Sequence, residues 1–233
     1  MKKERIWEID ALRGFMIVCM VFVHLVIGSE GLITWPEWLI AVFSRLGALF
    51  VILSGVSATL GRRSFRRGII VFACGLLLEL GSFIAVRLGV LADGMVIRFG
   101  VLHLLGVCMM IWPLLQKSEP WVLLVTGAVI IGVGYWFETF YVTPSFLYPI
   151  GLVNESFCSG DFYPLFPQLG FFLLGGALGK WLYPEKKSLL PKVNSDRAVW
   201  RFFRFCGRHS LIIYLIHFLL VGGILMLLSA VLL

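Results

Sequence analysis

The chain has 233 residues, of which 60% are hydrophobic and 14% are charged, and its formal net charge is +7. Soluble domains average about 45–50% apolar and about 25% charged residues, so this composition excludes a water-soluble globular protein. The positive charge does not indicate nucleic-acid binding, because the lysines and arginines gather in short segments between long apolar runs, as they do in the cytoplasmic loops of membrane proteins.

Seven apolar runs are long enough to cross a bilayer, which takes about 20 residues of helix. They cover residues 9–28, 38–60, 67–86, 97–116, 120–140, 164–183 and 208–231. Pro36, Pro120 and Pro164 stand where runs begin, and proline is tolerated in the first turn of a helix. The sequence therefore predicts an all-α, polytopic membrane protein with seven transmembrane helices, which forms a single domain over residues 1–233 in the lipid bilayer.

The distribution of lysine and arginine indicates how these helices are oriented. Most basic residues lie in the N-terminal segment and in the connections after the second, fourth and sixth predicted helices, whereas the other connections are acidic and aromatic. Positively charged loops stay on the cytoplasmic side. We therefore expect a multi-pass protein of the cell (inner) membrane with its N-terminus in the cytoplasm and its C-terminus outside. The first apolar run is too long for the core of a signal peptide, so we expect it to be retained.

The first predicted helix carries two polar side chains, Arg13 and His24, with a spacing of 11 residues. At about 100° per residue both side chains leave the helix on nearly the same face, roughly 16 Å apart along its axis. Because such groups avoid lipid and face protein or a water-filled cavity, this face is a candidate for chemistry across the membrane. Asp10, three residues before Arg13, could pair with it on the same helix.

Further polar side chains fall within the later predicted helices, mostly in their outer halves. Arg45 and Glu79, on the second and third helices, could reach the same depth and form a structural ion pair. Arg98 and His103 fall in the first turns of the fourth helix, and His217 falls near the middle of the seventh. Since imidazole titrates near neutral pH, we expect at least one of His24, His103 and His217 to be functional.

The sequence shows no pattern for a metal or a known phosphate-binding loop. Cys19, Cys74, Cys108, Cys158 and Cys206 form no CxxC motif and no metal-ligand spacing, so no metal is expected. The sequence GGALG at 175–179 is not a recognised nucleotide loop. We expect it instead to allow close packing between helices.

Four blocks of the sequence resemble one family. They are RIWEIDALRGFMIVCMVFVHL (5–25), RFGVLHLLGV (98–107), DFYPLFPQLGFFLLGGALGKWLYP (161–184) and GRHSLIIYLIH (207–217). In this order they are similar to bacterial proteins related to the catalytic domain of heparan-α-glucosaminide N-acetyltransferase. More distantly, the pair Arg13 and His24 and the Tyr-Leu-x-His motif that ends at His217 resemble the membrane acyltransferase-3 family.

The resemblance implies a membrane acyltransferase, an acyl-CoA-dependent O- or N-acetyltransferase whose donor is cytoplasmic acetyl-CoA and whose acceptor is a carbohydrate or amino sugar on the far side. It makes His24 the candidate catalytic base and Arg13 its companion at the donor, and we assign Asp10 and His217 to the donor site as well. Arg98 and His103 are candidates for stabilising the oxyanion of the transition state. The lysosomal enzyme has its catalytic histidine in the loop after the first helix, whereas residues 28–38 here, GSEGLITWPEW, contain none.

Two other functions remain open from the residues alone. Intramembrane histidine, arginine and glutamate also suit a small transporter or a proton-coupled carrier. A non-catalytic membrane subunit that only binds a partner is the second alternative. Whichever function it has, the chain could form a homo-oligomer.

Overall fold

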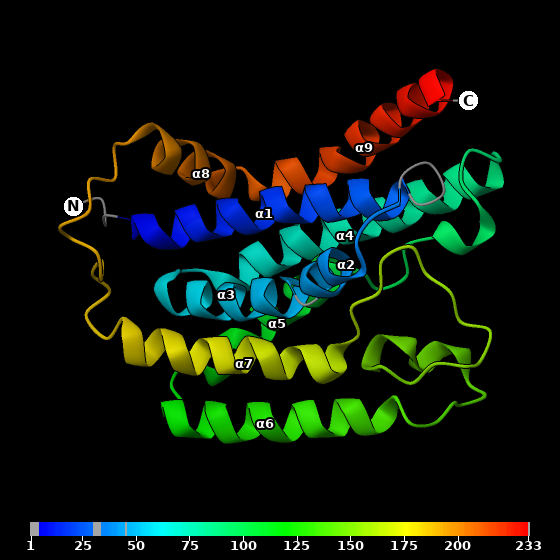
Figure 1. Cartoon of the computed structure of the whole chain (residues 1–233). Coiled ribbons are helices and arrows are strands. Elements are labelled where there is room, and N and C mark those ends of the chain that lie inside the picture. Colours follow the sequence, from blue (N-terminus) through cyan, green and yellow to red (C-terminus); the bar gives the residue numbers. More distant parts are fainter. Residues whose placement is uncertain (1–4, 30–33, 45, 233) are drawn as a thin grey trace. The chain divides into compact units, whose positions relative to one another are not determined.

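The computed structural model of the chain describes residues 5–29, 34–44 and 46–232. These residues form helices and connecting segments, and no β-strand occurs among them. The chain divides into two compact units, Met1–Phe50 with Glu185–Leu233, and Val51–Pro184 (Figure 1). The all-α prediction is therefore confirmed for the described residues.

The first unit is built around α1 (Trp7–Gly28), which contacts α2 (Glu37–Ser44), α8 (Ala198–Arg208) and α9 (Ser210–Leu232). Its closest packing is between α1 and α8, where two glycines allow the backbones to meet. A methyl group added at Gly14 would overlap the Phe203 carbonyl, and one added at Gly207 would overlap the Asp10 carbonyl. Aromatic rings flank this contact, with 5.6 Å between the ring centroids of Trp7 and Trp200.

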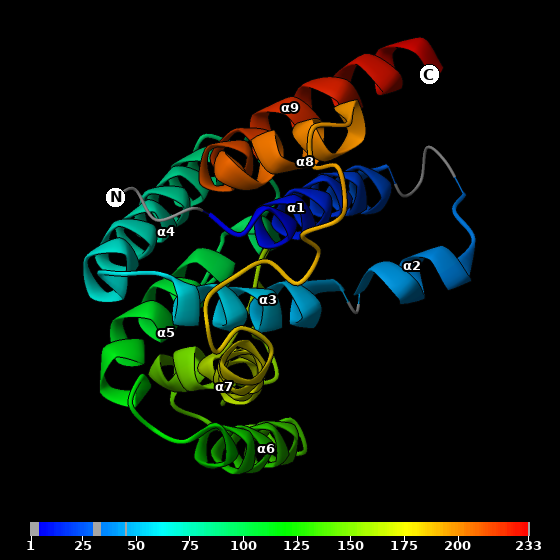
Figure 2. The same cartoon turned by 90° about the vertical axis from the view of Figure 1, so that its left-hand side faces the viewer.

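The second unit contains two helix pairs. The elements are α3 (Leu46–Leu60, from Val51 onward), α4 (Ser64–Arg87), η1 (Asp93–Met95), α5 (Val101–Leu115), α6 (Pro120–Phe137), η2 (Ser145–Ile150) and α7 (Leu165–Leu182). Helix α4 packs along α5, and α6 lies beside α7 in both views (Figures 1 and 2). The core between these helices is made of Val51, Leu104, Cys108, Trp112, Leu123, Phe172 and Leu173, all nearly inaccessible to solvent.

The glycines predicted to mediate helix packing do so. A methyl group at Gly175 would overlap the Ile52 carbonyl on α3, and one at Gly55 would overlap the Phe172 carbonyl on α7. Methyl groups added at Gly176 and Gly179 of the same GGALG sequence would also overlap neighbours, the Trp112 ring on α5 at 2.7 Å and the Thr59 hydroxyl on α3 at 2.6 Å. Small residues at helix contacts let backbones approach, as in other membrane proteins.

Three of the described helices are long and apolar enough to cross a membrane: α1, α4 and α6. They correspond to the predicted helices over 9–28, 67–86 and 120–140. Much of their apolar surface is exposed in the unit itself, for example 67% of Leu77 and 60% of Val125, as expected for side chains that face lipid. Helices α3 and α5 are apolar but shorter.

The run 38–60 corresponds to α2 and α3, and residue 45 between them lies outside the described residues. Another predicted helix differs from the structure at its start. The run 97–116 was predicted to be helical from its start, which is wrong, since α5 begins at Val101. The backbone N–H groups of Ile97 and Arg98 donate instead to serine side chains of other segments, and Phe99 has a φ of 52° that no helix accommodates.

Candidate functional site

The first unit brings together two of the predicted site residues, His24 of α1 and His217 of α9. Their ring centroids are 4.7 Å apart and their planes meet at 69°. His217 is fully buried, and His24 is partly buried. The sequence placed both histidines on apolar helices but did not predict that their rings would be in contact.

Both histidines of this pair are held in a defined tautomer by their own helices. The Nδ1 of His24 lies 2.9 Å from the Met20 carbonyl oxygen, and the Nδ1 of His217 contacts the Tyr214 carbonyl oxygen. A carbonyl oxygen only accepts hydrogen bonds, so each Nδ1 carries the hydrogen and each neutral ring keeps its lone pair on Nε2. The Nε2 atoms are therefore the ones that can take up a proton.

Arg13 and Asp10 occupy the N-terminal half of α1. Because α1 is helical from Trp7 to Gly28, the predicted register of Arg13 and His24 on one face is retained. Asp10 is buried, and its Oδ2 lies 3.5 Å from Nε of Arg208 and 3.9 Å from Nη1 of Arg5. Arg208 reaches Asp10 from the end of α8, a partner that the local spacing on α1 could not suggest.

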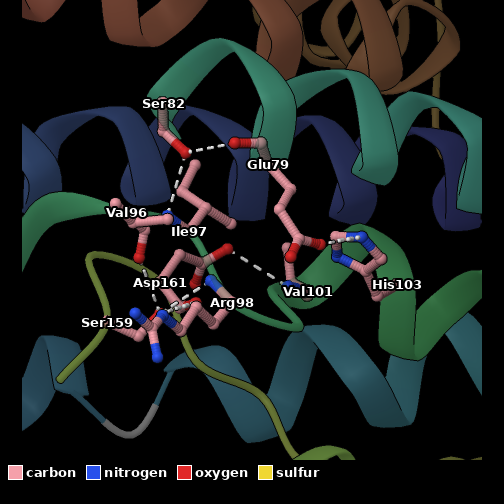
Figure 3. A network of polar contacts seen from close by, with 9 residues as sticks. All are labelled: Glu79, Ser82, Val96, Ile97, Arg98, Val101, His103, Ser159 and Asp161. Atoms are coloured by element: carbon pink, nitrogen blue, oxygen red, sulfur yellow. Dashed lines mark hydrogen bonds and ion pairs between the residues drawn. The ribbon is translucent and has the colours of Figure 1, made fainter. Parts of the chain in front are cut away.

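The second unit holds a separate polar cluster at the junction of α4 and α5 (Figure 3). Oε2 of Glu79 lies 3.2 Å from Nε2 of His103, with 33% of the Glu79 side chain exposed and only 2% of His103. The ring of His103 is held between Phe99, stacked at 5.7 Å, and the edge-on Phe72 at 5.3 Å. The predicted partner of Glu79, Arg45, lies outside the described residues, so their ion pair stays a prediction.

Hydrogen bonds from side chains of other segments fix the backbone that leads into α5. The Ser82 hydroxyl accepts a bond of 3.0 Å from the Ile97 N–H and donates one of 2.9 Å to the Glu79 carbonyl. The Ser159 hydroxyl accepts a bond of 2.9 Å from the Arg98 N–H. Figure 3 shows the Arg98 side chain beside Ser159, directed away from His103. Arg98 and His103, predicted to act together, thus belong to one cluster but point in different directions.

Tyr148 of η2 lies within electrostatic range of the same cluster, although no sequence pattern pointed to it. Burial raises the pKa of the Tyr148 hydroxyl, the Glu79 carboxylate raises it further, and the Arg98 guanidinium lowers it. These influences place the hydroxyl within electrostatic range of both charges. The Tyr148 ring also stacks on Phe157, with 5.6 Å between centroids. An acid, a cation and stacked aromatic rings thus gather at this end of the second unit.

Asp161 caps α5 from a distant part of the chain. The N-cap residue of α5, Gly100, has no side chain to accept a hydrogen bond, and Oδ2 of Asp161 accepts one of 3.1 Å from the Val101 N–H. A carboxylate at a helix N-terminus also interacts favourably with the helix dipole. We expect Asp161→Ala to lower the free energy of unfolding by about 1 kcal/mol, the usual loss for a removed cap, and Asp161→Asn to lower it less.

Thermal unfolding of the purified protein in detergent measures this effect. Ser156→Ala is the matched control, because the exposed Ser156 hydroxyl bonds only within its own turn, to Asn154 at 3.2 Å. A melting temperature of Asp161→Ala equal to that of the control would show that the cap contributes nothing.

Within the described part of the chain, no group of three or more His, Cys, Asp or Glu side chains is arranged to hold a metal ion. The predicted site residues that the structure describes fall into two groups, the histidine pair and the Asp10 ion pairs in the first unit and the cluster around Glu79 and His103 in the second. Imidazole rings suit proton transfer, while guanidinium groups suit binding of anions.

Comparison with known proteins adds one finding. The model of the family described as heparan-alpha-glucosaminide N-acetyltransferase, catalytic, matches residues 5–219 of the chain. The matched region contains every predicted site residue, from Asp10 to His217. No curated protein and no solved structure matches the chain.

Proposed function

Because the chain belongs to the family of the heparan-α-glucosaminide N-acetyltransferase catalytic domain, we propose that it transfers an acetyl group from cytoplasmic acetyl-CoA to a carbohydrate or amino-sugar acceptor across the membrane. Membership of this family indicates a membrane acetyltransferase, and the apolar helices α1, α4 and α6 agree with a membrane protein. The observation that carries the proposal is the family match over residues 5–219.

The proposal includes a topology. Seven helices cross the cell (inner) membrane, the N-terminus is cytoplasmic and the C-terminus is outside, with the chain alone or as a homo-oligomer. The positions of the basic segments support this orientation. The donor then approaches from the end of α1 that carries Arg13, and the acceptor approaches from the end that carries His24.

His24 is the proposed general base. Its Nε2, left with the lone pair by the bond from Nδ1 to Met20, accepts the proton of the acceptor hydroxyl or amine. The acceptor oxygen or nitrogen then bonds to the carbonyl carbon of the acetyl group, and the bond from that carbon to sulfur breaks. The thiolate of CoA leaves and takes up the proton from Nε2 of His24, which returns the ring to its neutral form. The ring of His217 lies against that of His24, with 4.7 Å between their centroids, and so helps to fix the position of the base.

Arg13, Asp10 and His217 form the proposed donor site. An arginine binds phosphate oxygens through paired N–H groups, and Arg13 lies on the same helix and nearly the same face as His24. Asp10, held by Arg208 and Arg5, contributes an anchored carboxylate one turn away from Arg13. His217 is the proposed donor-site residue that lies directly beside the base, because its ring contacts the ring of His24.

In the second unit, Arg98 and His103 remain the proposed stabilisers of developing negative charge. Arg98 has an exposed side chain that can reach a bound molecule, whereas His103 is buried and acts together with Glu79. The proposed ion pair of Arg45 with Glu79 would place a positive charge beside this carboxylate.

Calorimetry of acetyl-CoA binding to the purified protein in detergent tests the donor half of this proposal. We expect wild type to bind, and Arg13→Ala to bind roughly 10- to 150-fold more weakly, because a hydrogen-bonded charge contributes about 1.5–3 kcal/mol. Arg87→Ala is the control, since Arg87 ends α4 over the Phe83 ring, on the predicted outer side. Equal affinities for the two variants would remove Arg13 from the donor site, and no binding to folded wild type would contradict the acetyltransferase.

A further inference from the structure

Helix α8, which lies in the basic segment after the sixth predicted helix, presents three faces with different chemistry. The first face packs on α1 through Trp200, Phe203 and Gly207. Trp200 meets Trp7 edge-on at 5.6 Å, and Phe203 meets Phe15 at the same centroid distance. This face is already occupied within the unit.

The second face is apolar and exposed. Val199, Phe202 and Phe205 follow one another at intervals of three residues, which places them on one strip of the helix. Their exposed fractions are 59%, 54% and 60%. Two phenylalanines and a valine exposed along one strip are unfavourable in water, so an apolar medium or partner covers them.

The third face is cationic. It carries Arg201, Arg204 and Arg208, preceded by Arg197 at the N-cap. Arg204 pairs with Asp196 at 3.3 Å, and Arg208 pairs with Asp10 at 3.5 Å. Arg197 and Arg201 are exposed, and the described residues offer them no acid within ion-pair distance. Two guanidinium groups are thus available beside the apolar strip.

The helices next to α8, its packing partner α1 and the following helix α9, suggest what its exposed faces contact. Helix α1, on which it packs, is long and apolar enough to span a membrane, and the apolar α9 begins at Ser210, directly after α8 ends. Helix α8 therefore lies next to apolar helices at its C-terminal end, where α9 begins, and along the face that packs on α1. A helix with an apolar strip and an arginine face at such a place matches the composition of helices that lie in the membrane–water interface.

We propose that α8 is an anionic-lipid-binding helix. Val199, Phe202 and Phe205 lie among the acyl chains near the bilayer surface, and Arg197 and Arg201 bind the phosphates of anionic phospholipid headgroups. Charge complementarity selects this occupant, because guanidinium groups bind phosphate through paired hydrogen bonds while an apolar strip excludes water-soluble anions. This inference stands independently of the acetyltransferase activity.

The arginine face is tested by the lipid dependence of thermal stability. Phosphatidylglycerol and, separately, phosphatidylcholine are added to the purified full chain in detergent, and the melting temperature is measured. We expect phosphatidylglycerol alone to raise it, with a half-maximal concentration about 25-fold higher for the Arg197→Gln/Arg201→Gln variant, since each arginine contributes roughly a fivefold gain in affinity for an anionic surface. Arg62→Gln/Arg66→Gln, which changes two exposed arginines near the start of α4, is the matched control.

An unchanged half-maximal concentration in the α8 variant would overturn the proposal, as would an equal increase in the control. Acetyl-CoA is the other phosphate compound to examine. If the α8 variant loses acetyl-CoA affinity by calorimetry and keeps its response to phosphatidylglycerol, the arginines bind the donor, and the lipid assignment is wrong.

The apolar strip is tested separately with a fluorophore attached to a single introduced cysteine. Phe202→Cys places the fluorophore on the apolar strip, and Arg201→Cys places it on the arginine face. Both are made with Cys158→Ser, which removes the exposed native thiol. In bilayers that contain brominated phosphatidylglycerol, we expect strong quenching at position 202 and weak quenching at position 201. Equal quenching, or none at position 202, would show that lipid does not cover the strip.

Discussion

We expect the His24→Ala variant to lose acetyl transfer by about 100- to 10,000-fold, the range that removal of a general base typically produces. The bond between Nδ1 of His24 and the Met20 carbonyl leaves Nε2 as the proton acceptor, and alanine offers no replacement. Acetyl-CoA binding should persist, because the proposed phosphate ligand, Arg13, lies near the other end of α1. Release of the CoA thiol in the presence of amino-sugar acceptors measures the loss.

The chain offers a matched control for this variant. His209 also has its Nδ1 2.9 Å from a backbone carbonyl oxygen four residues earlier, that of Phe205, but it is exposed at the end of α8. His209→Ala should transfer acetyl at the wild-type rate. If His24→Ala retains activity while it folds normally, His24 is not the base.

The second large effect concerns packing between helices. We expect Gly175→Ala to lower the free energy of unfolding by about 3 kcal/mol, because the added methyl group would overlap the backbone carbonyl of Ile52 on α3. A backbone carbonyl in a helix cannot turn aside as a side chain can, so α3 and α7 must separate. The result is read as a lower melting temperature and a smaller yield of monodisperse protein in detergent.

Gly132→Ala is the control for this substitution. Gly132 lies in α6, and no atom stands within 4 Å of the place that its methyl group would take. Alanine also has a higher helix propensity than glycine, by about 1 kcal/mol, so this variant should be as stable as wild type or more so. Equal melting temperatures for Gly175→Ala and Gly132→Ala would show that the helices do not pack as closely as described.

The sequence predicted those features that depend on one segment alone. The continuous apolar run of α1 placed Arg13 and His24 on one helix face, and the small residues at 175–179 predicted close packing. Residues 97–100 were misjudged because their apolar character hides a segment whose N–H groups bond to Ser82 and Ser159. Helix α8 was missed because its arginines were interpreted only as a sign of orientation, although the three-residue spacing of Val199, Phe202 and Phe205 was visible.

Contacts between distant segments could not be predicted in this way. Helices α1 and α9 are apolar nearly all round, so the sequence does not say which face of either one turns inward, and the contact of His24 with His217 follows from packing alone. The position of Glu79 shows the same limit. Its predicted depth matched that of Arg45, and no sequence pattern indicated His103, whose Nε2 lies 3.2 Å from the Glu79 carboxylate.

The most direct test of the acetyltransferase is transfer across a bilayer. The purified protein is placed in sealed vesicles and sorted for one orientation, with labelled acetyl-CoA outside and a panel of amino sugars and oligosaccharides inside. With the cytoplasmic face outward, wild type should form labelled acetylated product inside the vesicles, release CoA thiol outside, and do neither in the opposite orientation. Flux of a solute without donor would instead indicate a transporter, and neither product nor flux from folded protein would indicate a non-catalytic subunit; either result would contradict the proposal.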